Sequence, residues 1–138
     1  MVAATRCHNP AVADNELAFL AGRSVEQIWV WGPVRLVIEL GGRRAPDVYI
    51  DFDDAVFTTR GGDEIAVDAF ERPAEAGIVL TLLNDRIDDA RYNDGTLYLS
   101  FGSGAKLRAL PSAKYESWCV AGDGMTLRCL PGGEIGSW

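Results

Sequence analysis

The chain has 138 residues, of which 48% are hydrophobic, and a formal net charge of −7. A chain of this length can bury the core of one domain without disulfides or a structural metal. No basic region followed by an apolar run opens the sequence, and no stretch approaches the ~20 apolar residues of a membrane span. We therefore expect a cytoplasmic protein that does not enter a membrane.

The acidic residues are concentrated in one segment. Eight acids and the single base Arg60 lie between Asp47 and Glu71, so this segment carries a net charge of −7, while the other residues balance at 12 acids and 12 bases. Concentrated negative charge repels nucleic acids and anionic lipids and attracts cationic partners. The charge pattern therefore favours a cationic partner over a nucleic acid.

The chain is predicted to begin with an arm and a hairpin. Residues 1–16 lack periodicity, and we expect them to form a mobile N-terminal arm that precedes a single globular domain, residues 17–138. The runs "SVEQIWVWG" and "VRLVIEL" are rich in residues that favour strands. Gly32-Pro33 separates them, and this turn signal predicts the first hairpin.

The next segment, "DVYIDFDD", alternates strictly between apolar and polar residues. This period of two predicts a strand with one buried face and one acidic face in water. The buried face comprises Val48, Ile50 and Phe52, and the wet face comprises Asp47, Tyr49, Asp51 and Asp53. The run "VFTTRGGDEIAVDAF" predicts two short strands around Gly61-Gly62, with a helix after Asp63 as the alternative.

One short helix, residues 74–84, is predicted in the middle of the chain. Pro73 suits a first helical position, and apolar residues recur at helical spacing, namely Ile78, Val79, Leu82 and Leu83. Strands follow at even spacing, separated by turn signals at Asp94-Gly95, Gly102-Ser103-Gly104, Pro111 and Gly122-Asp123-Gly124. The pattern predicts an α+β, β-rich fold, in which an antiparallel meander forms a curled sheet or partial barrel with one short helix.

The end of the chain, "CLPGGEIGSW", is predicted to complete the sheet. Two glycines after Pro131 let the chain reverse, and residues 134–137 can then add a short final strand. We expect Trp138 to pack against the end of the sheet and to anchor the strand.

The three cysteines, Cys7, Cys119 and Cys129, are expected to be free thiols. No CxxC pair is present, so a zinc site is not predicted. If Val120 pairs with Met125 across the Gly-Asp-Gly turn, bringing Cys119 to Cys129 would need a slip of three residues in register. This register argues against a disulfide.

Candidate catalytic residues are few. The single histidine, His8, lies in the expected arm, which argues against a nucleophilic triad. Asp51 and Asp53 project from one strand face, close enough to share a divalent cation or to raise one another's pKa, and Glu39 could add a third carboxylate. The leading interpretation has no catalytic residue, no metal and no cofactor; a metal-dependent hydrolase centred on residues 51–54 is an alternative.

The tryptophans support a further alternative. Trp29 and Trp31 share one side of the first predicted strand. Such pairs are most often buried in the core, whereas exposed ones act as hot spots of interfaces. Together with Trp118 they would line the mouth of a half-barrel that binds a small molecule.

The last third of the chain carries a recognisable motif, Tyr-Glu-x-Trp followed by Cys-x-Pro-Gly-Gly-Glu and a final Trp. With a preceding Asp-Gly-x-Leu, its positions are Asp94, Gly95, Leu97, Tyr115, Glu116, Trp118, Cys129, Pro131, Gly132, Gly133, Glu134 and Trp138. Residues 86–138 resemble a family of small uncharacterised actinobacterial proteins. The resemblance implies a domain without an assigned catalytic residue. By analogy of size and acidity, it also suggests a protein of the same class as the immunity proteins encoded beside secreted toxins.

These observations favour a non-enzymatic acidic protein-binding module, most specifically an immunity-type protein that neutralises a basic toxin. Negative potential on a rigid sheet accelerates association with a basic cleft. The predicted partner-binding residues are Asp47, Tyr49, Asp51, Asp53, Asp54, Asp63, Glu64 and Asp68. The expected partner is a cationic, toxin-like protein, with neither nucleic acid nor membrane as a partner and the oligomeric state left open.

Overall fold

The computed structural model describes residues 16–41 and 46–138. In these residues the chain forms two antiparallel sheets and two short 3₁₀ helices, and the sheets do not close into a barrel. The predicted β-rich α+β class is therefore confirmed. The expected N-terminal arm, up to residue 15, and the thiol of Cys7 lie outside the described residues.

Six strands make the first sheet and five make the second. The six-stranded sheet has the order β1 (Gln27–Val30), β2 (Val34–Leu40), β3 (Pro46–Phe52), β9 (Trp118–Gly122), β10 (Met125–Cys129), β11 (Ile135–Ser137). The five-stranded sheet has the order β5 (Glu64–Asp68), β4 (Asp54–Thr58), β8 (Lys106–Ala109), β7 (Thr96–Phe101), β6 (Ile87–Asn93). The run after Asp63 is thus a strand of a hairpin around Gly61-Gly62, and the helical alternative for it is wrong.

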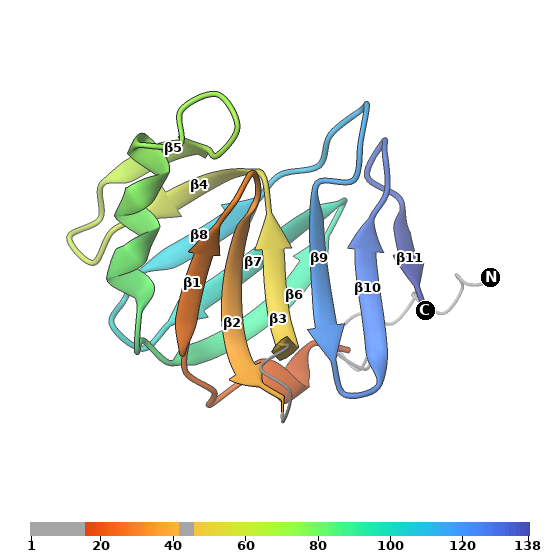
Figure 1. Cartoon of the computed structure of the whole chain (residues 1–138), viewed down its shortest axis with the longest axis horizontal. Coiled ribbons are helices and arrows are strands. Elements are labelled where there is room, and N and C mark those ends of the chain that lie inside the picture. Colours follow the sequence, from red (N-terminus) through yellow and green to blue (C-terminus); the bar gives the residue numbers. More distant parts are fainter. Residues whose placement is uncertain (1–15, 42–45) are drawn as a thin grey trace.

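The two sheets pack face to face. In Figure 1 the strands of the six-stranded sheet stand upright in front, and those of the five-stranded sheet cross behind them obliquely. One cluster of buried side chains fills the space between the sheets; its largest members include Trp118, Phe52, Phe57, Leu36, Ile50 and Leu99. Val48, Ile50 and Phe52 are buried, as the alternation of this strand predicted.

The chain passes from one sheet to the other at two neighbouring places. The first lies between β3 and β4, where Asp53 alone separates the two strands, and the second lies between β8 and β9. After the second passage β9 pairs with β3, whereas β8 pairs with β4. The fold therefore differs from one continuous meander, because in each sheet two neighbouring strands are far apart in sequence.

The predicted helix forms as a 3₁₀ helix, η2 (Glu75–Leu82), and a second one, η1 (Ala18–Leu20), precedes β1. The buried residues of η2 are Ala76, Val79 and Leu82, which recur every third residue, as the tighter 3₁₀ turn requires. Leu83, one of the four apolar residues at helical spacing, follows the helix and is exposed. Among the described residues no helix is long and apolar enough to cross a membrane.

The β9–β10 turn is tighter than the sequence suggested. Asp123 and Gly124 both have positive φ and form a two-residue turn, so that Gly122, rather than Val120, lies opposite Met125. The expected register is thus wrong by two residues, and Cys119 lies opposite Arg128. Cys119 and Cys129 are free thiols, as predicted. Because Cys129 follows Arg128 on β10, the side chains of Cys119 and Cys129 lie on opposite faces of the sheet.

The predicted final strand is present, but Trp138 does not pack into the molecule. β11 pairs with β10, and the backbone of Trp138 continues this pairing through two hydrogen bonds with Thr126, at 2.9 and 2.8 Å. The Trp138 side chain is 65% exposed and lies over the guanidinium of Arg128. Backbone pairing therefore holds this strand, and the expected burial of the indole is wrong.

Candidate functional site

The structure divides the eight predicted partner-binding residues among separate places. One group gathers where the chain passes between the sheets: Asp53, Asp54 and Asp68. A second group lies on the outer face of the six-stranded sheet: Tyr49 and Asp51. The rest lie near the opposite end of β3 and at the turn end of the β4–β5 hairpin: Asp47, Asp63 and Glu64.

A cleft opens beside the first group. It has a volume of about 660 Å³, and we call it the acidic cleft; its lining residues are Asp53, Asp68, Phe70, Glu71, Tyr115 and Glu116. Three segments contribute to it, namely the β3–β4 passage, the end of β5 with the chain that follows, and the chain before β9. The cleft therefore forms where the two connections between the sheets lie side by side.

Asp53 is the most buried of the residues that line the acidic cleft. Only 8% of the residue is exposed, and its backbone is fixed on both sides: its N–H donates to the Ser117 carbonyl (3.1 Å), and its carbonyl accepts from the N–H of Ala69 (3.4 Å). Among residues 16–41 and 46–138 no cation pairs with its carboxylate. The sequence predicted a solvated Asp53, and this prediction is wrong because the sheet passage buries it.

Burial and neighbouring acids make Asp53 hard to ionise. Desolvation, followed by the negative charges of Asp54, Asp51 and Asp68, raises the pKa of the Asp53 carboxyl to about 6. The pKa of Asp54 is also raised, first by burial and then by Asp68, which lies directly opposite it in the β4–β5 pair. Acidic neighbours thus add to the effect of burial at both carboxyls, and a cation placed beside them would be attracted.

The turn after β5 forms one side of the cleft. The Asp68 carboxylate accepts a hydrogen bond from the backbone N–H of Glu71 (3.0 Å), and this bond fixes the turn. Phe70, at the middle of the turn, is 57% exposed, and its ring lies close to Gly32 in the β1–β2 connection. An exposed aromatic ring is thus held beside the carboxylates.

The segment before β9 contributes another aromatic ring and another carboxylate. The hydroxyl of Ser112 accepts hydrogen bonds from the backbone N–H groups of Lys114 (3.1 Å) and Tyr115 (3.4 Å). Tyr115 is exposed, and Glu116 beside it accepts a hydrogen bond from Arg128 (3.0 Å). The charge of Glu116 is therefore partly compensated, unlike that of Asp53.

Asp51 has a different environment, although it precedes Asp53 by only two residues. Both of its oxygens accept hydrogen bonds from the guanidinium of Arg35, at 2.7 and 2.8 Å. This pair raises the pKa of Arg35, with the hydrogen bond to Asp51 as the largest cause. The same guanidinium lies over the rings of Tyr49, Trp31 and Trp29, with distances of 4.0, 4.7 and 5.8 Å to their centroids.

The tryptophans are therefore not brought together in one mouth. Trp29 and Trp31 lie on the outer face of the six-stranded sheet with Arg35, and Trp31 is 55% exposed. The expected burial of this pair is wrong. Trp118, by contrast, is buried between the sheets, where its ring nitrogen donates a hydrogen bond to the Gly95 carbonyl (2.9 Å).

Of the three carboxylates considered as metal ligands, Glu39, Asp51 and Asp53, two are bound by arginines. Glu39 forms an ion pair with Arg23 (2.7 Å), and Asp51 is held by Arg35. Within the described part of the chain, no three His, Cys, Asp or Glu side chains are arranged to hold a metal ion.

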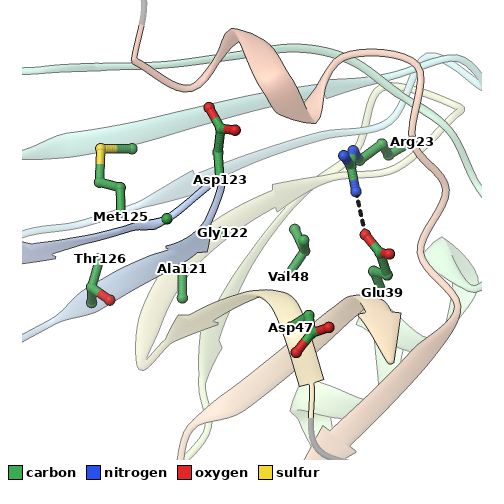
Figure 2. Close-up of a pocket in the computed structure, with 10 residues that line it drawn as sticks. Arg23, Glu39, Asp47, Val48, Ala121, Gly122, Asp123, Met125 and Thr126 are labelled. Carbon is green, nitrogen blue, oxygen red and sulfur yellow. Dashed lines mark hydrogen bonds and ion pairs between the residues drawn. The ribbon is translucent and has the colours of Figure 1, made fainter. Parts of the chain in front are cut away.

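A second depression, of about 480 Å³, lies at the other end of the six-stranded sheet. Figure 2 shows the Arg23–Glu39 ion pair on one side of it and Asp123 with Met125 on the other. Asp47, at the start of β3, is also among its lining residues. Here an arginine is among the lining residues, so the charge of the depression is mixed.

Four residues of the acidic cleft were absent from the predicted site: Phe70, Glu71, Tyr115 and Glu116. Glu71 belongs to the acidic segment of the sequence, and Tyr115 and Glu116 belong to the C-terminal motif, which were the available signals. Phe70 has no such signal. The pairing of distant strands brings these residues together, and no local pattern encodes that pairing.

Comparison with known proteins gives a family but no function. No curated protein and no solved structure matches the chain. A family model matches residues 16–138, which include all of both sheets and the acidic cleft. The chain therefore belongs to DUF6188, a family of unknown function.

Proposed function

We propose that this chain is a non-enzymatic, acidic protein-binding module of the cytoplasm that binds a cationic protein. Most specifically, we propose an immunity-type protein that neutralises a basic toxin partner. The chain's analogy in size and acidity to immunity proteins agrees with this role.

The observation that supports the proposal best is the composition of the acidic cleft. Its lining residues are four acids and two aromatic residues, with no lysine or arginine among them. Arginine, tyrosine and tryptophan dominate binding energy at interfaces, and acidic groups beside exposed rings are complementary to an arginine-rich surface. A cationic protein is therefore the partner whose charge fits this site.

The net charge supports the same partner at longer range. The chain has 20 acids against 13 lysines and arginines, so its field attracts a basic protein before contact. Such steering raises association rates by factors of about 10–10³ and weakens as salt screens the charges. A protein that must intercept a toxin quickly benefits from this effect.

The proposal is tested with the product of a neighbouring toxin-like gene. We expect a complex whose dissociation constant rises at least about tenfold between 0.05 and 0.5 M NaCl, roughly the range over which the Debye length falls from 14 to 4 Å. Inhibition of the toxin by the purified chain is the second measurement. Absence of binding to any cationic protein encoded nearby would sink the proposal.

A matched pair of charge reversals locates the binding surface. Glu71→Arg changes an exposed residue of the cleft, whereas Asp63→Arg makes the same change at the far end of the β4–β5 hairpin. We expect Glu71→Arg to weaken the complex about tenfold and Asp63→Arg to weaken it less than threefold. Equal effects of both variants would contradict binding through the cleft.

A further inference from the structure

The acidic cleft resembles, in its residue types, a site that the molecule fills elsewhere with its own arginine. Two residues before Asp53, on β3, Asp51 binds the guanidinium of Arg35 through both oxygens, and that guanidinium stacks over Tyr49 and Trp31. This arrangement of a carboxylate and flanking rings is a complete receptor for an arginine side chain.

The cleft has the carboxylate and the rings but no cation. Asp53 is more than nine-tenths buried and lines the cleft, and no cation pairs with it in the described part of the chain. Phe70 and Tyr115 line the same cleft and are both exposed. A buried carboxylate without a counter-ion is energetically costly, and an entering cation removes that cost.

From this likeness we propose that the acidic cleft is a receptor for one arginine side chain presented by the protein partner. Asp53 would bind the guanidinium, and Phe70 and Tyr115 would contact its faces or its aliphatic stem. The inference rests on the proposed function, because it names the group of the cationic partner that the cleft accepts.

The size and the charges of the cleft agree with this ligand. A volume of about 660 Å³ admits a whole arginine side chain and lies within the range of about 300–1,000 Å³ typical of small-ligand sites. Asp68 and Glu71 also line the cleft and add negative charge to it. A guanidinium is favoured over an ammonium because it is planar, less strongly hydrated and able to stack on rings.

The test uses the isolated chain and N-acetylarginine amide, a small molecule with the side chain in question and no other charge. At pH 7.5 we expect this probe to shift the NMR signals of the Phe70 and Tyr115 rings with a dissociation constant on the order of 1 mM. N-acetylcitrulline amide, which has nearly the same shape without the charge, should give no saturable shift, and N-acetyllysine amide should bind at least about threefold more weakly.

Matched variants assign the effect to the cleft. Asp53→Asn should weaken the arginine probe at least about tenfold, and Tyr115→Leu about threefold, whereas Asp123→Asn, with the same change in net charge at the other end of the six-stranded sheet, should leave the affinity unchanged. In the unchanged chain the probe should also lower the pKa of Asp53, which carboxyl ¹³C shifts report directly.

The outcomes separate this inference from the proposed function. If a cationic protein binds in a salt-dependent manner but the arginine probe shifts neither ring, the arginine receptor is wrong and the protein-binding role stands. If N-acetyllysine amide binds as well as the arginine probe, the guanidinium assignment is wrong. If the probe binds and no cationic protein does, the receptor stands and the protein-binding role fails.

Discussion

Asp51, on β3, and Asp53, directly after that strand, show how two identical residues two positions apart acquire different properties. Asp51 lies opposite Arg35 on β2, which neutralises it. The pairing of β2 with β3 ends at Val34 and Phe52, so no residue of β2 lies opposite Asp53. On the β9 side its backbone bonds to Ser117, whose hydroxyl has no hydrogen-bond partner within the described residues. The sequence shows two equivalent acids, and only the register distinguishes them.

The raised pKa of Asp53 predicts how pH affects stability. Its pKa is about 6 in the folded chain against an ordinary value of 3.8, so folding favours the protonated form. The penalty for a charged Asp53 is fully present above pH 6, decreases as pH falls, and is absent below pH 3.8. We expect Asp53→Asn to raise the free energy of unfolding by roughly 2 kcal/mol at pH 7.5, since one pKa unit corresponds to about 1.4 kcal/mol.

Urea denaturation of both proteins at pH 7.5 and pH 4 measures this effect. Taking the difference between variant and parent at each pH cancels the titration of the other acids. The stabilising effect of Asp53→Asn should nearly disappear at pH 4, where the Asp53 carboxyl is itself mostly neutral. A variant that is less stable than its parent at both pH values would contradict the assigned burial of an unpaired charge.

At the scale of the elements, the hairpins were predictable and their packing partners were not. Asp94-Gly95 and Asp123-Gly124 have positive φ at both residues, the conformation that Asp-Gly sequences favour in two-residue hairpin turns. The strands on either side alternate as expected. What the sequence does not show is that the Asp94-Gly95 turn packs against the chain before β11, where Gly133 lies directly beside Gly95.

This contact explains why residues of the C-terminal motif are spaced as they are. The Gly95 carbonyl accepts hydrogen bonds from the Trp118 ring nitrogen (2.9 Å) and from the Cys129 thiol (3.4 Å). Gly133 completes the cluster from a neighbouring turn. Much of the motif therefore stabilises one junction of the fold, whereas its Tyr115 and Glu116 face the acidic cleft.

Two glycines with almost the same backbone conformation test this junction. A methyl group at Gly95 (φ 79°) would lie 2.9 Å from the Cα of Gly133, whereas at Gly124 (φ 74°) nothing lies within 4 Å. We expect Gly124→Ala to cost about 1 kcal/mol, the penalty of the left-handed conformation alone. Gly95→Ala should cost at least about 2 kcal/mol more because backbone must move apart. Chemical denaturation compares them, and equal losses would argue against the Gly95–Gly133 contact.

At the scale of the molecule, local sequence patterns do not predict the division of the strands into two sheets. Local turn signals join β1 to β2, β6 to β7, and β9 to β10, and each of these hairpins is present. The pairs β3–β9 and β4–β8 join segments more than 40 residues apart and have no turn between them. The clustering of acids along the chain therefore suggested a single acidic surface, but the fold distributes these residues over two sheets.

The two sheets are interleaved along the chain, which predicts a single unfolding transition. The five-stranded sheet, β4 to β8, is inserted within the six-stranded one, because the chain leaves the six-stranded sheet after β3 and returns to it at β9. Side chains of both sheets also share one core cluster, so loss of either sheet exposes the buried face of the other. Neither sheet can unfold while the other keeps its core.

We therefore expect the calorimetric and van't Hoff enthalpies of unfolding to agree, as they do for a single cooperative domain. Urea transitions followed by far-ultraviolet circular dichroism and by tryptophan fluorescence should coincide. The fluorescence includes the signal of Trp118, which is buried between the sheets, while circular dichroism reports both sheets together. Separate midpoints for the two signals would show that one sheet survives without the other, which the shared core does not allow.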